Sequence, residues 1–186
     1  PDGAALVHAA AEHWVARATE AIAARGHFAV ALSGGTTPRA AYSLLATTPW
    51  AGRVEWARVH VFWGDERCVP LDHPESNYRL AREALLDHVP LPPDNVHRMR
   101  GELEPQEAAA DYAVTLRRFF APGGTPRFDL VLLGLGKDGH TASLFPGAAA
   151  LAETARLVVA AAATYEDRPA WRITLTLPAL NAAREI

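Results

Sequence analysis

The chain has little of what disulfide frameworks, membrane spans and nucleic-acid-binding surfaces require. It holds a single cysteine, Cys68, which excludes an internal disulfide and fits a reducing compartment. No apolar run approaches the roughly 20 residues that span a bilayer. The net charge of −3 gives no electrostatic reason to bind nucleic acid or an anionic membrane. We therefore expect a soluble, cytoplasmic protein with no nucleic-acid partner and no membrane partner.

Several catalytic signatures are also missing. The eight histidines are scattered along the chain, so no cluster has the spacing of zinc ligands. No Gly-x-Ser-x-Gly elbow is present to carry a serine nucleophile. Ser143 lies close to His140 in sequence, but we interpret it as a loop or cap serine rather than a nucleophile.

What the sequence does contain is an alternation of helical and strand patterns. The 186 residues are 49% hydrophobic and 21% charged, which is typical of one globular domain, here residues 1–186. Apolar periodicity predicts helices over 4–24, 40–45, 77–85 and 106–120, and strands over 28–32, 59–63, 130–133, 157–163 and 172–177. This order predicts an α/β fold with an open, mostly parallel sheet and helices on both faces.

The stretch that follows the strand at 130–133 is the best candidate for a catalytic loop. Three glycines break the strand, and Lys137, Asp138 and His140 come with them. Ligands of open parallel sheets bind at the carboxyl ends of the strands. Histidine exchanges protons near neutral pH, since its ordinary pKa is about 6.5. We therefore expect His140 to act in proton transfer.

The same loop matches a dinucleotide-binding pattern, Gly-x-Gly-x-x-Gly, at residues 134–139. That interpretation needs a long helix directly after the glycines and an acidic residue about 20 positions further on. Pro146 arrives too early for such a helix, and Glu153 precedes the next apolar run instead of following it. We therefore disfavour nucleotide binding.

A second candidate site is the Ser-Gly-Gly-Thr-Thr-Pro turn at residues 33–38, between the first strand and a helix. The unpaired N–H groups and the dipole of a helix N-terminus favour an anion, and glycines allow its close approach. The turn is not a Walker loop, because no Gly-Lys-Ser/Thr follows. A phosphate site and an ordinary turn with a threonine cap both stay open at this point.

A third candidate is the run Asp65, Glu66 and Arg67, which follows the strand at 59–63. Charged residues at a carboxyl end point to the same ligand-binding edge. A surface cluster of ion pairs would give the same pattern. Two such clusters at one edge favour the functional interpretation.

Together these segments resemble the 6-phosphogluconolactonases, within the superfamily that they share with the glucosamine-6-phosphate deaminases. The matching segments occur in the family's order and cover nearly the whole chain. They are residues 31–38, 63–67, 76–79, 134–146 and 172–176.

The resemblance implies a Rossmann-like fold and hydrolysis of 6-phospho-D-glucono-1,5-lactone in the pentose phosphate pathway, with no required cofactor or metal. It implies that His140 is the general base and that Arg67 stabilises negative charge on the carbonyl oxygen. Asp65 would orient Arg67, and Asp138 would orient His140. The implied phosphate-binding residues are Ser33, Gly34, Gly35, Thr36, Thr37 and Arg172, and the other substrate contacts are Asn77, Gly136 and Lys137.

The partner is then a phosphorylated sugar lactone, for a monomer or a small homo-oligomer. The competing activity is that of the deaminases, which carry Asp-Glu-Tyr where this chain has Asp65, Glu66 and Arg67. A non-catalytic sugar-phosphate-binding module of the same fold is a further alternative. The family continues into another strand, a Gly-x-x-Lys-like turn and a last helix, so we expect that this chain lacks them.

Overall fold

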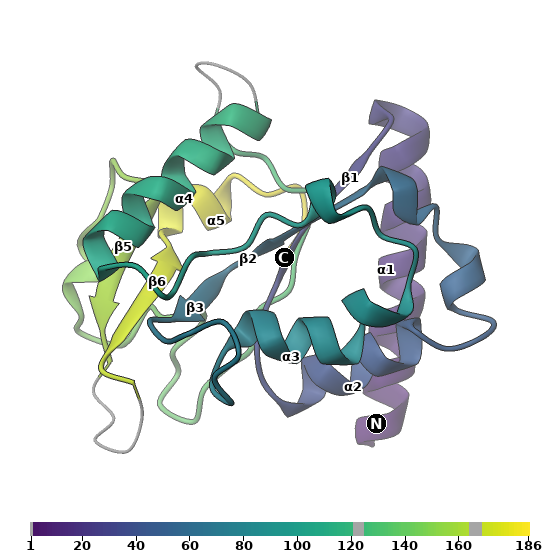
Figure 1. Cartoon of the computed structure of the whole chain (residues 1–186), viewed down its shortest axis with the longest axis horizontal. Helices are drawn as coiled ribbons and strands as arrows, with labels where there is room; N and C mark the ends of the chain where they lie inside the picture. Colours follow the sequence, from purple (N-terminus) through teal and green to yellow (C-terminus); the bar gives the residue numbers. More distant parts are fainter. Residues whose placement is uncertain (1, 121–124, 164–168) are drawn as a thin grey trace.

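The computed structural model describes residues 2–120, 125–163 and 169–186, and its strands form two three-stranded sheets (Figure 1). The first sheet is parallel, in the order β2-β1-β4, and the second is antiparallel, in the order β3-β6-β5. The strands are β1 Phe28–Leu32, β2 Val59–Trp63, β3 Asp65–Arg67, β4 Leu130–Val131, β5 Val158–Ala162 and β6 Trp171–Leu175. The predicted α/β class is confirmed, and the antiparallel second sheet is a feature that the alternating pattern did not reveal.

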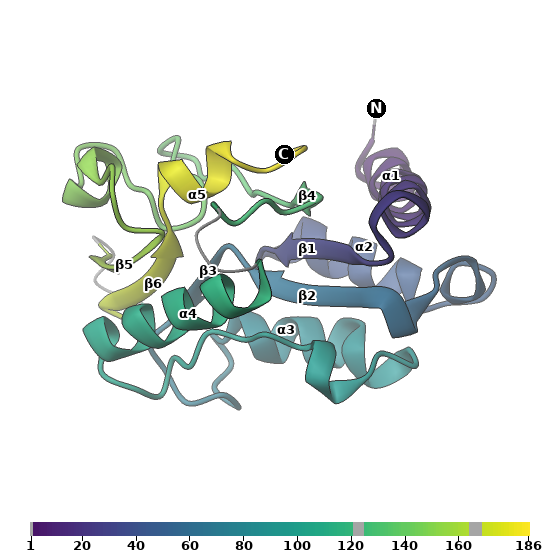
Figure 2. The same ribbon diagram turned by 90° about the horizontal axis from the view of Figure 1, so that it is seen from above.

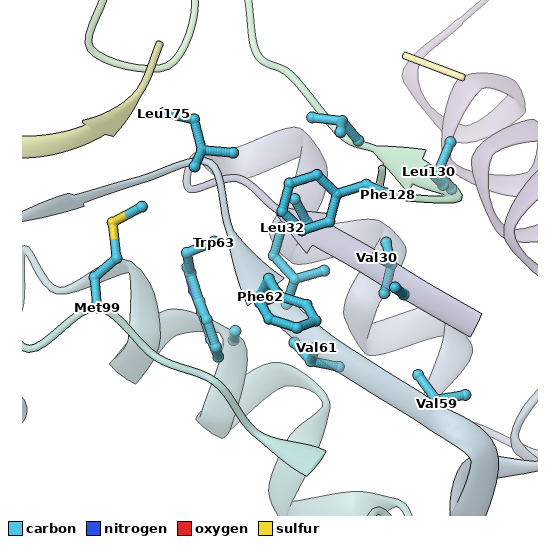
Figure 3. Close-up of a cluster of buried hydrophobic side chains, with 14 of the residues drawn as sticks. Val30, Leu32, Val59, Val61, Phe62, Trp63, Met99, Phe128, Leu130 and Leu175 are labelled. Carbon is cyan, nitrogen blue, oxygen red and sulfur yellow. The ribbon is translucent and has the colours of Figure 1, made fainter. Parts of the chain in front are cut away.

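The centre of the parallel sheet is β1, whose five residues are all buried. It pairs with β2 from Phe28 to Leu32 and with β4 through Val30 and Ala31. Phe62 of β2 and Phe128 meet edge to face at 5.4 Å beside Leu32 (Figure 3). Each large apolar side chain buried in this way contributes about 1.5–3 kcal/mol. An unbroken apolar strand is stable here because both of its faces are covered.

The helices lie on both sides of the parallel sheet. They are α1 Gly3–Arg25, α2 Thr36–Leu45, α3 Asn77–Ala84, α4 Pro105–Phe119 and α5 Leu177–Asn181. Figure 1 shows α2 and α3 on one side of β1 and β2, and α4 on the other side with β5 and β6. In Figure 2 the strands β4, β1 and β2 run side by side, with α2 and α3 behind them. None of the helices among the described residues combines the length and hydropathy needed to cross a bilayer.

Helix ends follow the local sequence. Gly26 ends α1, with φ at 79° and an N–H that donates to the Ile22 carbonyl. Ser76 caps α3, because its side chain accepts a hydrogen bond from the Arg79 N–H.

Two buried tyrosines hold the carboxyl ends of the central strands. The Tyr42 hydroxyl of α2 accepts from the Ser33 N–H and donates to the Ser33 carbonyl. The Tyr112 hydroxyl of α4 makes the same pair of bonds with Trp63. These backbone groups lie where the strand ladder ends, so the tyrosines fix the points at which the chain leaves the sheet.

Candidate active site

A cavity of about 560 Å³ lies at the carboxyl ends of β1, β2 and β4. Ten predicted site residues from four separate segments line it: Ser33, Gly34, Gly35, Thr36, Thr37, Asp65, Arg67, Asn77, Gly136 and His140. Its lining also includes apolar residues, among them Leu6 and Ala10 of α1 and Leu133 and Leu135 of the loop after β4. The parallel sheet thus brings the loop of the predicted base and the predicted phosphate turn to one edge. The predicted arginine reaches the same cavity from β3 of the antiparallel sheet, which follows β2 directly in the chain.

The loop after β4 holds His140 at the cavity by local contacts. Its Nδ1 lies 2.5 Å from Oδ1 of Asp138, and its ring lies 4.8 Å from the buried ring of Phe145. A carboxylate can only accept, so the Nδ1–H donates to Asp138 and Nε2 is the basic nitrogen of the neutral ring. This contact agrees with the expected orienting role of Asp138, which stays a prediction.

Gly136 is essential to this arrangement for a steric reason. A Cβ atom built on Gly136 would lie 2.2 Å from both Nδ1 and Cε1 of His140 and 2.7 Å from Oδ1 of Asp138. Any side chain would therefore displace the imidazole or its partner. No helix follows Gly139 among the described residues up to Ala148, so the Gly-x-Gly-x-x-Gly pattern lacks the helix that dinucleotide binding needs.

Arg67 points its guanidinium towards Glu75. Its Nη1 donates to the Glu75 carbonyl and lies 3.3 Å from Oε2 of the same residue. Its Nε is buried and has no hydrogen-bond partner among the described residues. The Asp65 carboxylate instead contacts Ser143 and Asn77. Glu75 is thus the carboxylate that contacts Arg67, and the orienting role expected for Asp65 stays a prediction.

The predicted phosphate turn leads directly into α2. Gly35 is the N-cap, with φ at 110°, a backbone conformation that favours glycine, and no side chain caps the helix. This excludes the threonine cap that was the alternative interpretation. The Ser33 hydroxyl is buried in the cavity lining without a hydrogen-bond partner among the described residues. An uncapped helix start with an unpaired hydroxyl beside it suits an anion such as a phosphate.

Asn77 adds a second unpaired polar atom to the lining. Its Nδ2 donates to the backbone carbonyl and to Oδ1 of Asp65, at 3.0 and 3.2 Å. Its Oδ1 is buried and unpartnered among the described residues. A Cβ atom on Gly34 would lie 1.9 Å from this oxygen, so Gly34 makes room for the amide of Asn77.

Glu66 has a structural position, although the sequence grouped it with its neighbours. It is 2% exposed and accepts from the N–H groups of Arg67, Asn77 and Tyr78 and from the Ser76 hydroxyl. Burial raises the pKa of Glu66 to about 7, against the lowering effect of the three backbone N–H groups. Its contacts join β3 to the first turn of α3.

Three predicted site residues lie outside the cavity lining: Lys137, Asp138 and Arg172. Lys137 and Asp138 are exposed on the loop after β4. Arg172 is 3% exposed and lies opposite Arg67 in the register of β6 and β3. Sequence reasoning missed the contacts of Glu75 with Arg67 and of Ser143 with Asp65, which join different segments of the chain. Glu75 stands next to the recognised Ser76-Asn77-Tyr78-Arg79 segment, which was the one available signal for it.

No set of three or more His, Cys, Asp and Glu side chains within the described ranges could hold a metal ion.

In comparison with known proteins, the whole chain, residues 1–186, matches the family described as Glucosamine-6-phosphate isomerases/6-phosphogluconolactonase. The chain is 46% identical to a 6-phosphogluconolactonase of Synechocystis, over 91% of this chain and 69% of that protein. It is 43% identical to the 6-phosphogluconolactonase of Mycobacterium tuberculosis, over 100% of this chain and 76% of that protein. The solved structure of 6-phosphogluconolactonase from Trypanosoma brucei superposes with a TM-score of 0.87 at 32% identity, covering 98% of this chain and 76% of that one.

Proposed function

The chain belongs to the family of glucosamine-6-phosphate isomerases and 6-phosphogluconolactonases, and from that premise we propose that it hydrolyses 6-phospho-D-glucono-1,5-lactone to 6-phosphogluconate, a step of the pentose phosphate pathway. Curated relatives at 42–46% identity carry the name 6-phosphogluconolactonase. The observation that carries the proposal is that one cavity is lined by His140, Arg67 and the 33–37 turn.

His140 serves as the general base in this proposal. Its Nε2 takes a proton from the water that attacks the lactone carbonyl carbon. The same proton then passes to the ring oxygen as the carbon–oxygen bond of the lactone breaks. Asp138 keeps the ring in the required tautomer through its contact with Nδ1. A positioned base of this kind contributes roughly 10²–10⁴ to the rate.

Arg67 stabilises the negative charge that develops on the carbonyl oxygen. Its Nε is a buried donor without a hydrogen-bond partner among the described residues, and Glu75 holds its Nη1. A donor fixed in advance costs little reorganisation in the transition state.

The 6-phosphate occupies the 33–37 turn, where the uncapped start of α2 and the Ser33 hydroxyl supply donors. We assign Arg172 to the same function, since side chains directly opposite in an antiparallel ladder share a face and Arg67 is its partner. Arg172→Ala should raise KM for the phosphorylated lactone far more than for gluconolactone. Equal effects on both substrates would reject this role.

The test of the whole proposal is an assay of lactone loss at neutral pH. We expect His140→Ala to abolish turnover while leaving phosphosugar binding largely intact, as measured by calorimetry with 6-phosphogluconate. His13→Ala is the matched control, because His13 is an exposed histidine on α1 that does not line the cavity. Full activity of His140→Ala would show that the base is wrongly assigned.

Glucosamine 6-phosphate, as a second substrate, separates the two activities of the family. This chain has Arg67 at the position where the glucosamine-6-phosphate deaminases carry a tyrosine. We therefore expect it to hydrolyse the lactone and to release no ammonia from glucosamine 6-phosphate. Ammonia release without lactone loss would reverse the assignment. If the protein bound phosphosugars but catalysed neither reaction, it would be a non-catalytic sugar-phosphate-binding module.

A further inference from the structure

Ser143 contacts a site residue from outside the cavity. It is 1% exposed and absent from the cavity lining, and its Oγ donates to Oδ2 of Asp65 at 2.7 Å. Its N–H donates to Oγ1 of Thr174 at 3.2 Å, and Thr174 is the register partner of Asp65 between β3 and β6. Ser143 is therefore held against the same sheet that carries Asp65, three positions after His140.

The other oxygen of this carboxylate holds Asn77. Both groups around the Asn77 nitrogen, Oδ1 and the backbone carbonyl of Asp65, are acceptors. The amide therefore cannot be reversed without setting its oxygen against two other oxygens. Its Oδ1 consequently lies away from Asp65 and against Gly34, buried in the cavity lining with no partner among the described residues.

We propose that Ser143 is a positioning residue that acts through Asp65 to hold the Asn77 amide with its oxygen ready to accept a hydrogen bond from a hydroxyl group of the sugar ring. This inference rests on the proposed function. It adds that the Asn77 oxygen is the group that recognises a particular hydroxyl of the sugar ring. Without the Ser143 hydroxyl, the Asp65 carboxylate loses one of its two side-chain anchors. The amide of Asn77 is then held mainly by the backbone carbonyl of Asp65, so the position of its oxygen is less strictly fixed.

The readout is discrimination between the lactone and its monodeoxy analogues that lack the hydroxyl at C2, C3 or C4. A buried acceptor disfavours a ligand that leaves it unpaired, so the wild type should prefer the parent over one analogue by at least about tenfold in kcat/KM. Asn77→Ala should abolish that preference. Ser143→Ala should reduce the preference by about threefold or more and not abolish it, because Asp65 loses its bond to Ser143 but keeps its bond to Asn77. Ser143→Thr, which keeps the hydroxyl, should retain it.

Thr141→Val is the control within the same loop. It removes a hydroxyl that donates to the Gly134 carbonyl and does not contact Asp65, so the preference should persist. If Ser143→Ala leaves the preference unchanged, or slows all the lactones equally, the positioning role is overturned. Calorimetry with 6-phosphogluconate and its deoxy forms measures the same preference without turnover. Failure of the wild type to hydrolyse the parent lactone would instead count against the proposed function.

Discussion

Adding a methyl group at Gly136 should displace the proposed base, His140, without disturbing the rest of the site. A Cβ atom there would lie 2.2 Å from two atoms of the His140 ring, whereas ordinary contact begins near 3.4 Å. The ring must therefore move by about 1 Å, and a misplacement of that size costs on the order of 10² in rate. We expect Gly136→Ala to lower kcat about 100-fold and to change KM for the phosphorylated lactone by about threefold at most, since the 33–37 turn is untouched.

Two glycines of the same loop supply the controls. Gly134 also lines the cavity, but nothing lies within 4 Å of a Cβ atom there, so Gly134→Ala should keep a kcat near that of the wild type. Gly139 has equal space but a φ of 87°, so Gly139→Ala should cost about 1 kcal/mol of stability through backbone strain alone. Steady-state kinetics and urea unfolding measure both effects. Similar kcat values for Gly136→Ala and Gly134→Ala would refute the steric reasoning and the placement of His140.

Two further predictions concern the residues around the site. Tyr42→Phe removes both side-chain bonds to the Ser33 backbone and should lower the free energy of unfolding by about 1–3 kcal/mol. It should also raise KM for the phosphorylated lactone, whereas Tyr112→Phe should give a similar loss of stability with KM unchanged. Burial raises the pKa of Glu66 from its ordinary 4.5 to about 7. The folded protein therefore keeps a proton that the unfolded chain releases, and stability falls as the pH rises through this window, by up to about 3 kcal/mol. Glu66→Gln should flatten that slope in urea unfolding at pH 5 and pH 8, and an unchanged slope would contradict the shift.

The sequence predicted individual elements well because their signals are local. The apolar run at 28–32 is β1, and the helical pattern at 106–120 is α4 within a residue of its bounds. The strand at 172–177 was less predictable in its surroundings, since Arg172, Thr174 and Thr176 alternate with apolar residues, a pattern typical of a strand with one polar face. The structure buries these three side chains, and Thr174 bonds to Ser143 of the loop after β4.

The same distinction between local and long-range signals applies to the candidate site. The segments that line the cavity were predictable, because glycines and charged residues follow strands whose carboxyl ends must meet in a parallel sheet. The contact between Asp138 and His140 was also within reach, because the two residues are close in sequence. The partner of Asp65 was not, because Ser143 belongs to a distant segment and periodicity carries no information about such pairs.

The assembly of the site at the boundary between two sheets follows from the single residue Gly64. Its N–H donates to the Leu32 carbonyl of the parallel sheet at 2.9 Å, and its carbonyl accepts from the Leu175 N–H beside the antiparallel sheet at 2.8 Å. The chain therefore leaves β2 and enters β3 without a loop, although the sequence predicted only a charged run after the strand at 59–63. Because β3 is a strand, Asp65 and Arg67 share one face, and both line the cavity. Had these residues formed an ordinary loop, neither side chain would be held by a ladder. The change of sheet thus gives two charged site residues the rigidity of secondary structure.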